Sequence, residues 1–424
     1  GRRMQPQVNS MHRRLRRRNG ARASACVALA FACLVASAGD WPQWRGANRD
    51  GVSPERGLTT TWPEGGPPSL WTRAIGEGFS GVSIVGDRVY TMAGQGEDEV
   101  VLCLDALTGE DVWRVPIDRK FTEGHGNGPR STPTVHDGAV YVLSAWGTLR
   151  AIDARYGDPI WEHDLREEYG GRSEASEPWR GYATSALVED DLLVVEVGGP
   201  DGGAVMAFDR VSGEQRWAAL SDPPAYSSPI GIEVDRLRQV VLLNGAAAVG
   251  LTLDGLEAWR YPWVTSYDQN VATPVFIAPN RVFISEGYDG KGAAMLEVAD
   301  SGLREVWRSE VMRNDFGSCV LADGFLYGFD GTSLKCIDAR DGAERWVKRG
   351  YGRGTLIAAD DVLIVLGERG QLVVVAAQPD EYVEHAAVKQ VIAGKCWTSP
   401  SLAHGRLYIR DEKTLIALDL RSGH

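Results

Sequence analysis

The sequence predicts an all-β fold, namely an eight-bladed β-propeller built from four-stranded antiparallel blades. Three observations lead to this prediction. A turn followed by tryptophan recurs about every forty residues, a period typical of repeat proteins whose units cover one another's apolar faces. Short apolar runs separated by turn residues fill the space between the copies. The two ends of the chain supply complementary parts of one further unit.

Four copies of the repeat share one spacing, in which Asp precedes Trp by eight residues and Gly precedes it by four. These copies are Asp105–Trp113, Asp153–Trp161, Asp209–Trp217 and Asp338–Trp346. The Asp is expected to accept backbone N–H groups of the turn, and the Gly to supply the positive φ of a bulged hairpin. The Trp offers a large apolar face and an N–H group, which suit it to wedge between neighbouring blades.

One blade can be followed from Ser131 to Trp161. Residues 131–135, 139–143 and 148–152 are β runs separated by turns, and a fourth run begins at Pro159. Four short antiparallel strands joined by hairpins make one propeller blade. Two looser copies end at Trp259 and Trp307, and a degenerate copy over 355–388 has His385 near the Trp position.

The chain ends are expected to share the eighth blade. Residues 397–419 give three β runs, and the chain then stops before a fourth. Near the N-terminus, residues 69–75 with Trp71 form a β run that lacks three predecessors. Joining the two parts would close the ring and remove exposed sheet edges. Seven blades is the alternative if residues 355–388 are an insertion.

The first 38 residues are interpreted as a secretory signal peptide. An arginine cluster precedes an apolar stretch over 23–35, and Ala36-Ser37-Ala38 is a small-x-small cleavage motif. The stretch is too short for a transmembrane helix. Residues before Met11 read as upstream read-through, which leaves the true start codon open. Phe31 makes a lipid anchor on Cys33 a poor fit. The predicted division is a signal peptide (1–38), an N-terminal arm (39–68) and a propeller (69–424), with an exported, periplasmic or extracellular location.

Charge and cysteine usage exclude several classes of function. The net charge is −12, and removal of residues 1–38 leaves 37 basic against 57 acidic side chains, a charge of −20. Such a surface disfavours nucleic acid as a partner. Cys103, Cys319, Cys336 and Cys396 form no Cys-x-x-Cys motif and no adjacent pair, so free buried thiols are expected and no metal site is predicted. The acidic clusters 97–99 and 167–168 lack calcium-loop spacing and are expected to be solvated.

Candidate binding residues lie just before or at the starts of the predicted innermost strands, which converge on one mouth of the central channel. They are Arg130, Arg180, Tyr226, Asp268, Asn270, Arg353 and Trp397. Together they would form a polar funnel for a ligand, a cofactor or a peptide. The alternative is that they only solvate the channel mouth and hydrogen-bond adjacent loops. No catalytic residue is predicted.

Three segments carry a resemblance to a known family. The pattern Ala-x-Asp-x-x-Thr-Gly-Glu-x-x-Trp is best matched at 104–113, Gly128-Pro-Arg-Ser-Thr-Pro133 is a second segment, and Asp40–Val52 precedes the repeats. These segments resemble the pyrroloquinoline-quinone (PQQ)-like propeller repeat family, over a span from Trp41 to the C-terminus. The resemblance implies a β-propeller. It leaves activity open, because the family includes quinone-dependent dehydrogenases, the outer-membrane assembly lipoprotein BamB and secreted proteins of unknown role.

The resemblance also implies a set of active-site features for any enzyme of this family. It implies an adjacent Cys–Cys disulfide over the quinone, a Trp beneath it, Ca²⁺ held by Glu, Asn and Asp, and an Asp base. No two cysteines are adjacent here, and the chain is shorter than those enzymes. We therefore expect a non-catalytic, monomeric BamB-like scaffold of the cell envelope, which binds a protein, peptide or ligand and has no cofactor. The alternative is a quinoprotein oxidoreductase or quinone-binding remnant, with PQQ and Ca²⁺ at the channel mouth.

Overall fold

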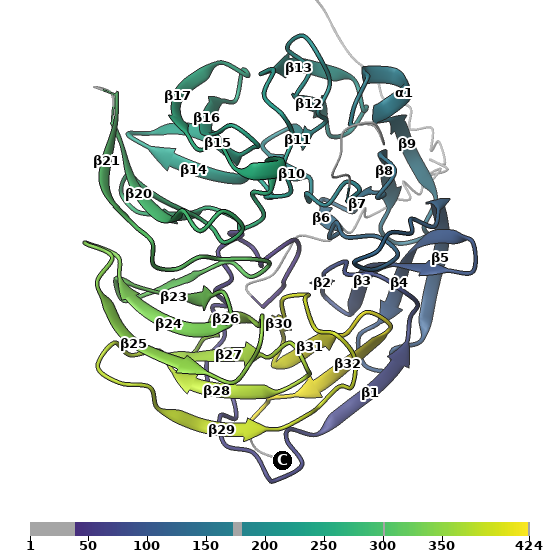
Figure 1. Ribbon diagram of the computed structural model, residues 1–424. Coiled ribbons are helices and arrows are strands. Elements are labelled where there is room, and N and C mark those ends of the chain that lie inside the picture. The colour runs from purple at the N-terminus through teal and green to yellow at the C-terminus, as the bar shows by residue number, and fades with distance from the viewer. Residues whose placement is uncertain (1–38, 173–179, 300–301, 423–424) are drawn as a thin grey trace, which may run out of the picture. The chain divides into compact units, whose positions relative to one another are not determined.

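The computed structural model describes residues 39–172, 180–299 and 302–422, which all belong to one compact unit spanning 34–424. Within these residues, eight four-stranded antiparallel sheets follow one another around a ring (Figure 1). The predicted eight-bladed propeller is confirmed, and the seven-blade alternative is wrong because residues 355–388 form a complete blade. No helix in the described residues is long and apolar enough to cross a membrane.

The first four blades follow in chain order. Blade 1 contains β2 (Ser83–Val85), β3 (Arg88–Gln95), β4 (Asp98–Asp105) and β5 (Asp111–Arg119). Blade 2 contains β6 (Thr134–His136), β7 (Ala139–Leu143), β8 (Thr148–Asp153) and β9 (Pro159–Asp164), followed by the short helix α1 (Leu165–Tyr169). Blade 3 contains β10 (Leu187–Glu189), β11 (Leu192–Glu196), β12 (Val205–Asp209) and β13 (Gln215–Ala219). Blade 4 contains β14 (Ile230–Val234), β15 (Leu237–Leu243), β16 (Ala247–Thr252) and β17 (Glu257–Pro262), followed by the 3-10 turn η1 (Ser266–Asp268).

The remaining four blades complete the ring. Blade 5 contains β18 (Val275–Ile277), β19 (Arg281–Glu286), β20 (Gly292–Ala299) and β21 (Gly302–Ser309). Blade 6 contains β22 (Val320–Ala322), β23 (Phe325–Asp330), β24 (Ser333–Asp338) and β25 (Glu344–Arg349). Blade 7 contains β26 (Thr355–Ala359), β27 (Val362–Leu366), β28 (Leu372–Ala376) and β29 (Glu384–Val388). Blade 8 contains β30 (Ser401–Ala403), β31 (Arg406–Arg410), β32 (Thr414–Asp419) and β1 (Ser69–Ala74).

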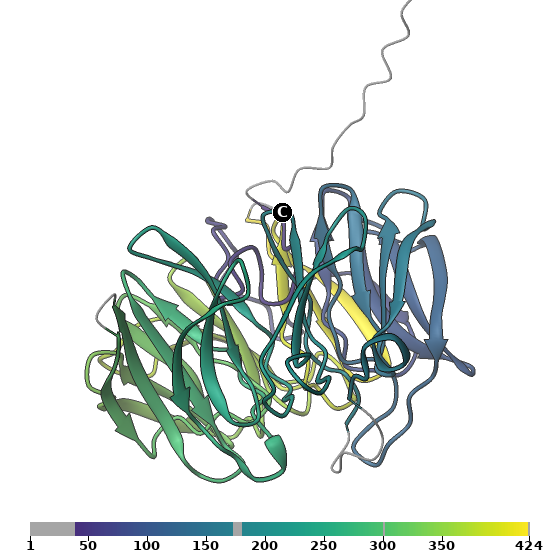
Figure 2. The same cartoon turned by 90° about the horizontal axis from the view of Figure 1, so that it is seen from above.

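The first strand of each blade is the innermost one, and first strands of neighbouring blades contact one another, for example β2 with β6 and β30. All these strands run in the same sense, so they begin at one face of the ring and end in hairpin turns at the other. We call these the mouth face and the far face. Figure 2 shows the ring from the side.

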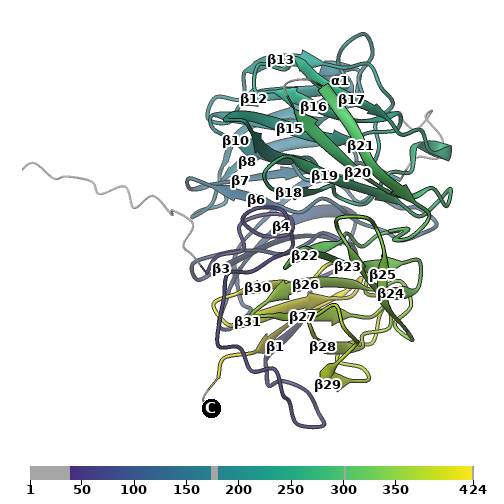
Figure 3. The same ribbon diagram turned by 90° about the vertical axis from the view of Figure 1, so that its left-hand side faces the viewer.

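The ring closes as predicted. Strand β1 pairs antiparallel with β32, with Trp71 opposite Ala417, so the two chain ends share blade 8 (Figure 3). A second link is Arg410 of β31, whose fully buried guanidinium donates to the carbonyl oxygens of Gly78 (2.9 Å), Ser80 (2.9 Å) and Met92 (3.1 Å). Strand β1 thus completes blade 8, and Arg410 bonds blade 8 to residues of blade 1 and of the segment before it.

The repeated tryptophan joins six of the eight blades to the next. Trp113 of blade 1 donates its Nε1 proton to the Ala154 carbonyl oxygen of blade 2 at 3.1 Å. Above the indole lies Gly157, with φ of 80°, where a Cβ would come within 2.9 Å of the ring. Asp153 accepts the N–H groups of Arg155 and Tyr156 in the same turn. The predicted roles of Asp, Gly and Trp are therefore confirmed here. The equivalent donors Trp71, Trp161, Trp217, Trp307 and Trp346 bond Ala106, Arg210, Leu253, Ala339 and Gln378.

Two blades depart from this pattern. The indole of Trp259 turns back to its own blade and donates to Gln239 Oε1 at 2.7 Å. In blade 7 the Trp position, which faces Val374 across the sheet, is occupied by Ala386, the residue after His385. Residues 58–68 of the arm lie near this junction. Within this segment, Leu58 and Trp62 pack on the core shared by blades 7, 8 and 1.

The N-terminal arm enters the channel at the far face and contacts every one of the eight blades. The purple segment at the centre of the ring in Figure 1 is this arm. Its contacts are Trp41 N to Ile84 O, Val135 N to Pro42 O, Arg49 to Ala186 O and Pro229 O, Trp44 to Thr273, Arg45 to Cys319 O, Ser53 N to Ala358 O, and Asp40 to His404. Arg45 and Arg49 are both about 2% exposed, and burial lowers the pKa of Arg45 to about 10 and that of Arg49 to about 9.

One expectation about surface acids is wrong. Glu99, predicted to be solvated, is fully buried and accepts the N–H of Ala145 at 3.0 Å and that of Phe121 at 3.4 Å. It accepts one backbone N–H from the connection between blades 1 and 2 and one from the β7–β8 turn of blade 2. Burial raises the pKa of Glu99 to about 7. Glu97, Asp98, Glu167 and Glu168 are exposed, as predicted.

Candidate functional site

A cavity of about 410 Å³ opens at the mouth face. Seven of its lining residues share one place in the fold, four positions before the first residue of an innermost strand. They are Phe79, Arg130, Ala183, Tyr226, Val271, Phe316 and Trp397. The arm also reaches the cavity through Trp44, whose Nε1 donates to Thr273 Oγ1 at 2.9 Å. The rest of the arm occupies the channel below and closes the base of the cavity. We call this cavity the cup.

A belt of hydroxyl groups holds these positions in place. Two residues before the innermost strand, a Ser or Thr hydroxyl accepts the backbone N–H of the equivalent residue in the preceding blade. Thr132 N bonds Ser185 Oγ, Ser185 N bonds Ser228 Oγ, and Thr273 N bonds Ser318 Oγ, each at 2.9 Å. These bonds cross blade boundaries, so they fix the rim of the cup as one piece.

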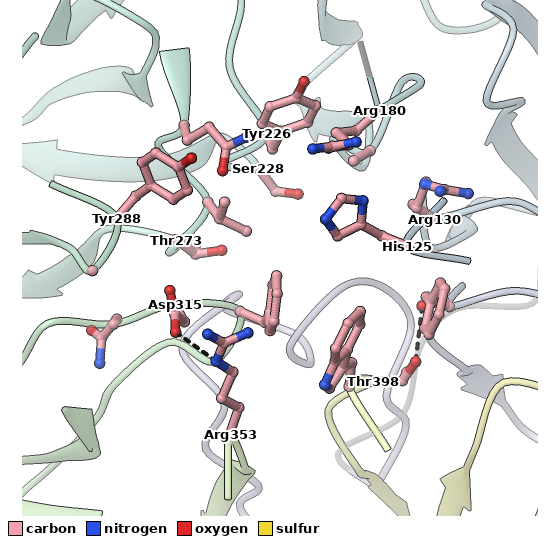
Figure 4. A pocket seen from close by; sticks show the side chains of 18 of the residues that line it. His125, Arg130, Arg180, Tyr226, Ser228, Thr273, Tyr288, Asp315, Arg353 and Thr398 are labelled. Carbon is pink, nitrogen blue, oxygen red and sulfur yellow. Dashed lines mark hydrogen bonds and ion pairs between the residues drawn. The ribbon is translucent and has the colours of Figure 1, made fainter. Parts of the chain in front are cut away.

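Five of the seven residues predicted from the sequence line the cavity: Arg130, Arg180, Tyr226, Arg353 and Trp397 (Figure 4 labels the first four). Asp268 and Asn270 are not among the lining residues. The Asn270 side chain is fully buried and donates Nδ2 to the carbonyl oxygens of Asn244 (2.7 Å) and Trp263 (3.3 Å). Asp268 packs over Gly245, and burial raises the pKa of its carboxyl group. Both residues shape the loop behind the cavity wall.

Glu123 organises one wall. Its Oε1 accepts from Arg130 Nη2 at 2.8 Å, and its Oε2 accepts from Arg180 Nη1 at 3.2 Å and from the His125 N–H at 2.9 Å. Burial acts to raise the pKa of Glu123, but the bonds from His125 and the two arginine charges outweigh it and lower the pKa. This wall therefore holds an ionised carboxylate shared by two guanidinium groups.

The opposite wall is built around Arg353. Its Nε lies 3.1 Å from Asp315 Oδ2, and its backbone N–H donates to Glu368 Oε2 at 3.2 Å. Glu368 also accepts from Trp397 Nε1 at 3.0 Å through its other oxygen, so one carboxylate positions both residues. Burial dominates at Asp315 and raises the pKa of its carboxyl group despite the neighbouring arginine.

Aromatic rings supply the apolar surface of the cavity. Phe316 stacks on Trp397 with ring centroids 4.5 Å apart, and Phe79 stacks on Trp397 at 5.5 Å. Lys395 Nζ lies 4.3 Å from the Trp397 ring centroid and donates to the His125 carbonyl oxygen at 3.1 Å. At the rim, the exposed Tyr288 makes an edge-to-face pair with Tyr267. Flat apolar rings and guanidinium groups thus meet in one recess.

Sequence reasoning missed Phe79, Glu123, His125, Asp315 and Phe316. Phe79 and Phe316 could have been found by aligning the repeats on their innermost strands, since both occupy the position of Trp397. Glu123 and His125 lie in the connection formed by residues 120–133. This connection does not follow the repeat pattern, so the sequence gives no sign that it borders the cavity. The His125 side chain is 58% exposed and also lines the cup.

A family model described as outer membrane protein assembly factor BamB matches residues 62–186, 97–348 and 330–424. The chain belongs to this family. The BamB of Burkholderia pseudomallei is 25% identical over 304 residues, which cover 70% of this chain and 63% of that protein. The chain therefore matches less than two thirds of the length of this relative.

Quinone enzymes are also among the relatives. A quinohemoprotein alcohol dehydrogenase of Comamonas testosteroni is 28% identical over 116 residues, covering 27% of this chain and 15% of that protein. Two solved structures share the fold. The crystal structure of BamB from Moraxella catarrhalis has a TM-score of 0.58 at 12% identity, covering 83% of this chain and 99% of that one. The Comamonas enzyme structure has a TM-score of 0.63 at 13% identity, covering 91% and 81%.

The lining of the cup does not fit a quinone held by calcium. Ca²⁺ takes six to eight oxygen ligands, several of them carboxylates. Among the described residues no group of three or more His, Cys, Asp and Glu side chains could hold a metal ion. The two carboxylates that line the cup, Glu123 and Asp315, both face arginines, whose charge disfavours a cation there. Cys103, Cys319, Cys336 and Cys396 are buried free thiols.

Proposed function

We propose that the chain is an exported, non-catalytic propeller that binds a segment of another envelope protein in the cup at its mouth face. One observation carries the proposal: exposed arginines and stacked aromatic rings converge on a recess held rigidly by bonds between blades. Arg180 and Arg353 have side chains 33% and 48% exposed, and they project from opposite walls (Figure 4). Membership of the BamB family supports a role in binding proteins.

The lining also indicates the chemistry of the segment. Three arginines face two carboxylates in the cup, so it carries a positive formal charge on a chain whose net charge is −12. Guanidinium groups bind carboxylates in a bidentate way, and aromatic rings favour flat or apolar side chains. A peptide segment with an acidic side chain next to an aromatic one therefore fits best, with Tyr288 and Tyr267 covering its exposed side.

Site-specific photocrosslinking tests this proposal. A photoreactive amino acid would replace Tyr288 at the rim of the cup, and Val211 at the far face would serve as the matched control because both side chains are exposed. We expect the Tyr288 position to give a discrete adduct with an envelope protein in the native host. Arg180→Ala together with Arg353→Ala should abolish that adduct. The same adducts from both positions, or none from Tyr288, would contradict the proposal.

A quinone-binding remnant is the second candidate. The Trp397 stack in the cup and the similarity to the Comamonas enzyme favour it. It predicts that PQQ raises the melting temperature of the purified protein and changes its visible absorbance on binding, and that Arg130→Ala or Trp397→Ala weakens both effects. Titration with and without Ca²⁺ decides the matter, since no response in either condition removes this candidate.

A further inference from the structure

The start of the arm is clamped between two hairpin turns at the far face. The Gly39 carbonyl oxygen accepts the His404 N–H at 3.3 Å. Asp40 Oδ1 accepts the Gly86 N–H at 2.9 Å and lies 2.8 Å from His404 Nε2. A Cβ on Gly39 would lie 2.9 Å from His404 Nδ1, closer than Cβ atoms pack. Only glycine therefore fits at position 39 without a shift of His404.

One buried carboxylate oxygen at this place makes no well-formed hydrogen bond. Glu55 Oε2 accepts the Gly405 N–H at 2.6 Å, whereas Oε1 is buried and has no partner at bonding geometry, although the His404 backbone N–H and the Arg406 charge both lie close enough to act on this carboxylate. Oε1 lies 3.6 Å from the Cβ position of Gly39. Because N and Cβ on one Cα are about 2.5 Å apart, the Gly39 nitrogen lies within about 6 Å of this oxygen. A buried carboxylate oxygen without a well-formed hydrogen bond is costly, so Oε1 can take a further donor from the Gly39 side.

We propose that Glu55 is the binding site for a new N-terminus created by cleavage between Ala38 and Gly39. Water hydrolyses this amide under the action of an export peptidase, which leaves a carboxylate on Ala38 and an ammonium group on Gly39. The ammonium donates to Glu55 Oε1. The inference rests on the proposed export of the chain, and the small-x-small residues 36–38 supply the cleavage motif.

Cleavage changes what position 39 can offer to Glu55. In the uncleaved chain the Gly39 nitrogen is a neutral amide with one N–H donor. After cleavage it carries a positive charge and three donors, which suit a buried carboxylate oxygen. Cleavage therefore strengthens the binding of the arm to the ring. Because the arm contacts every blade, this also stabilises the ring.

The test compares two forms of the protein that begin at Gly39, one with a free amine and one acetylated on that nitrogen, each with Glu55 or Glu55→Gln. We expect acetylation to lower the melting temperature by about 2 °C or more in the Glu55 protein, and to have no effect in the Glu55→Gln variant. If Glu55→Gln lowers the melting temperature equally in both forms, Arg406 or another group is the partner, and the proposal is overturned. Glu110→Gln, an exposed substitution, is the control.

Intact mass of the exported protein tests the cleavage separately. The expected first residue is Gly39. A different first residue overturns the proposed cleavage even if the acetylation effect is present. An unexported chain would contradict the proposed function, whereas an exported chain that begins at Gly39 and ignores acetylation would contradict only the Glu55 site.

Discussion

The indole Nε1 of Trp71 donates to the carbonyl oxygen of Ala106 at 3.1 Å, which links the last blade of the ring to the first. The N-terminal strand β1 thereby performs for blade 8 the task that the fourth strand performs in most other blades. The joint between the chain ends has the same construction as the internal joints. Its tryptophan should accordingly contribute as much stability as one inside the ring.

Substitution of Trp71 should destabilise the closed ring in two separable steps. Trp71→Phe keeps a ring against Gly109 and loses the bond to Ala106, so a loss of about 1 kcal/mol is expected. Trp71→Ala also leaves a cavity, for a total loss of about 3–5 kcal/mol. Urea unfolding followed by fluorescence measures both. Equal stabilities of the wild-type and Phe proteins would show that the hydrogen bond contributes nothing.

Removal of the Arg49 side chain should be more damaging than its place in an N-terminal arm suggests. Arg49→Met would leave the carbonyl oxygens of Ser185 and Pro229 without this donor inside the channel, whereas Ala186 O would keep the Thr134 hydroxyl. Each unsatisfied buried group costs about 1–3 kcal/mol, so a loss of about 2 kcal/mol or more in unfolding free energy is expected. Arg56→Ala, which breaks an exposed pair with Asp361, is the control and should cost under about 1 kcal/mol.

Glu99 should make stability depend on pH. Its pKa in the folded protein is about 7 against an ordinary value of 4.5, so folding favours the protonated form. The resulting stabilisation is complete below about pH 4.5 and is lost as the pH rises through 7. Glu99→Gln removes the titrating group but loses one of the two accepted N–H bonds at every pH, so the stability of the variant relative to wild type should rise by up to about 3 kcal/mol between pH 5 and pH 8. A difference that is independent of pH would contradict this assignment.

Two glycines with similar backbones should respond differently to alanine. Gly138 and Gly157 have φ of 78° and 80°, but a Cβ meets nothing within 4 Å at Gly138 and meets the Trp113 ring at 2.9 Å at Gly157. Gly138→Ala should cost about 1 kcal/mol from backbone strain alone. Gly157→Ala should cost clearly more, because Trp113 must also shift. Thermal unfolding of the two variants gives the comparison, and equal losses would show that the indole yields freely.

The architecture was predictable because the role of each residue in the repeat follows from its chemistry. Asp153 accepts N–H groups in the turn, Gly157 adopts the positive φ, Trp161 packs between blades, and these residue types recur at a fixed spacing. The mouth of the channel was predictable in outline for a related reason, since Arg130, Tyr226 and Trp397 precede innermost strands. Asp268 and Asn270 precede such a strand too, but their loop turns the Asn270 side chain inward to bond backbone carbonyl oxygens.

Other features leave no pattern in the sequence. Arg45 and Arg49 bind carbonyl oxygens, which every residue carries, so nothing in the partner segments reveals the contact. In the sequence Glu99 is one of several neighbouring acids, whereas in the structure it accepts N–H groups from Phe121 and Ala145, which are 22 and 46 residues away. Contacts between distant segments that use backbone groups were thus the part that required the structure.

The arm also sets an order of events for the folding chain. Its residues are made before any blade, yet their partners extend to His404, 364 residues beyond Asp40. Contacts between such distant residues form late, because closing the intervening loop costs entropy before any contact stabilises it. The segment that is synthesised first can therefore complete its docking only when the last blade has formed. Arg49 can reach its carbonyl partners only after blades 3 and 4 have formed, Arg45 only after blade 6, and Asp40 only after blade 8.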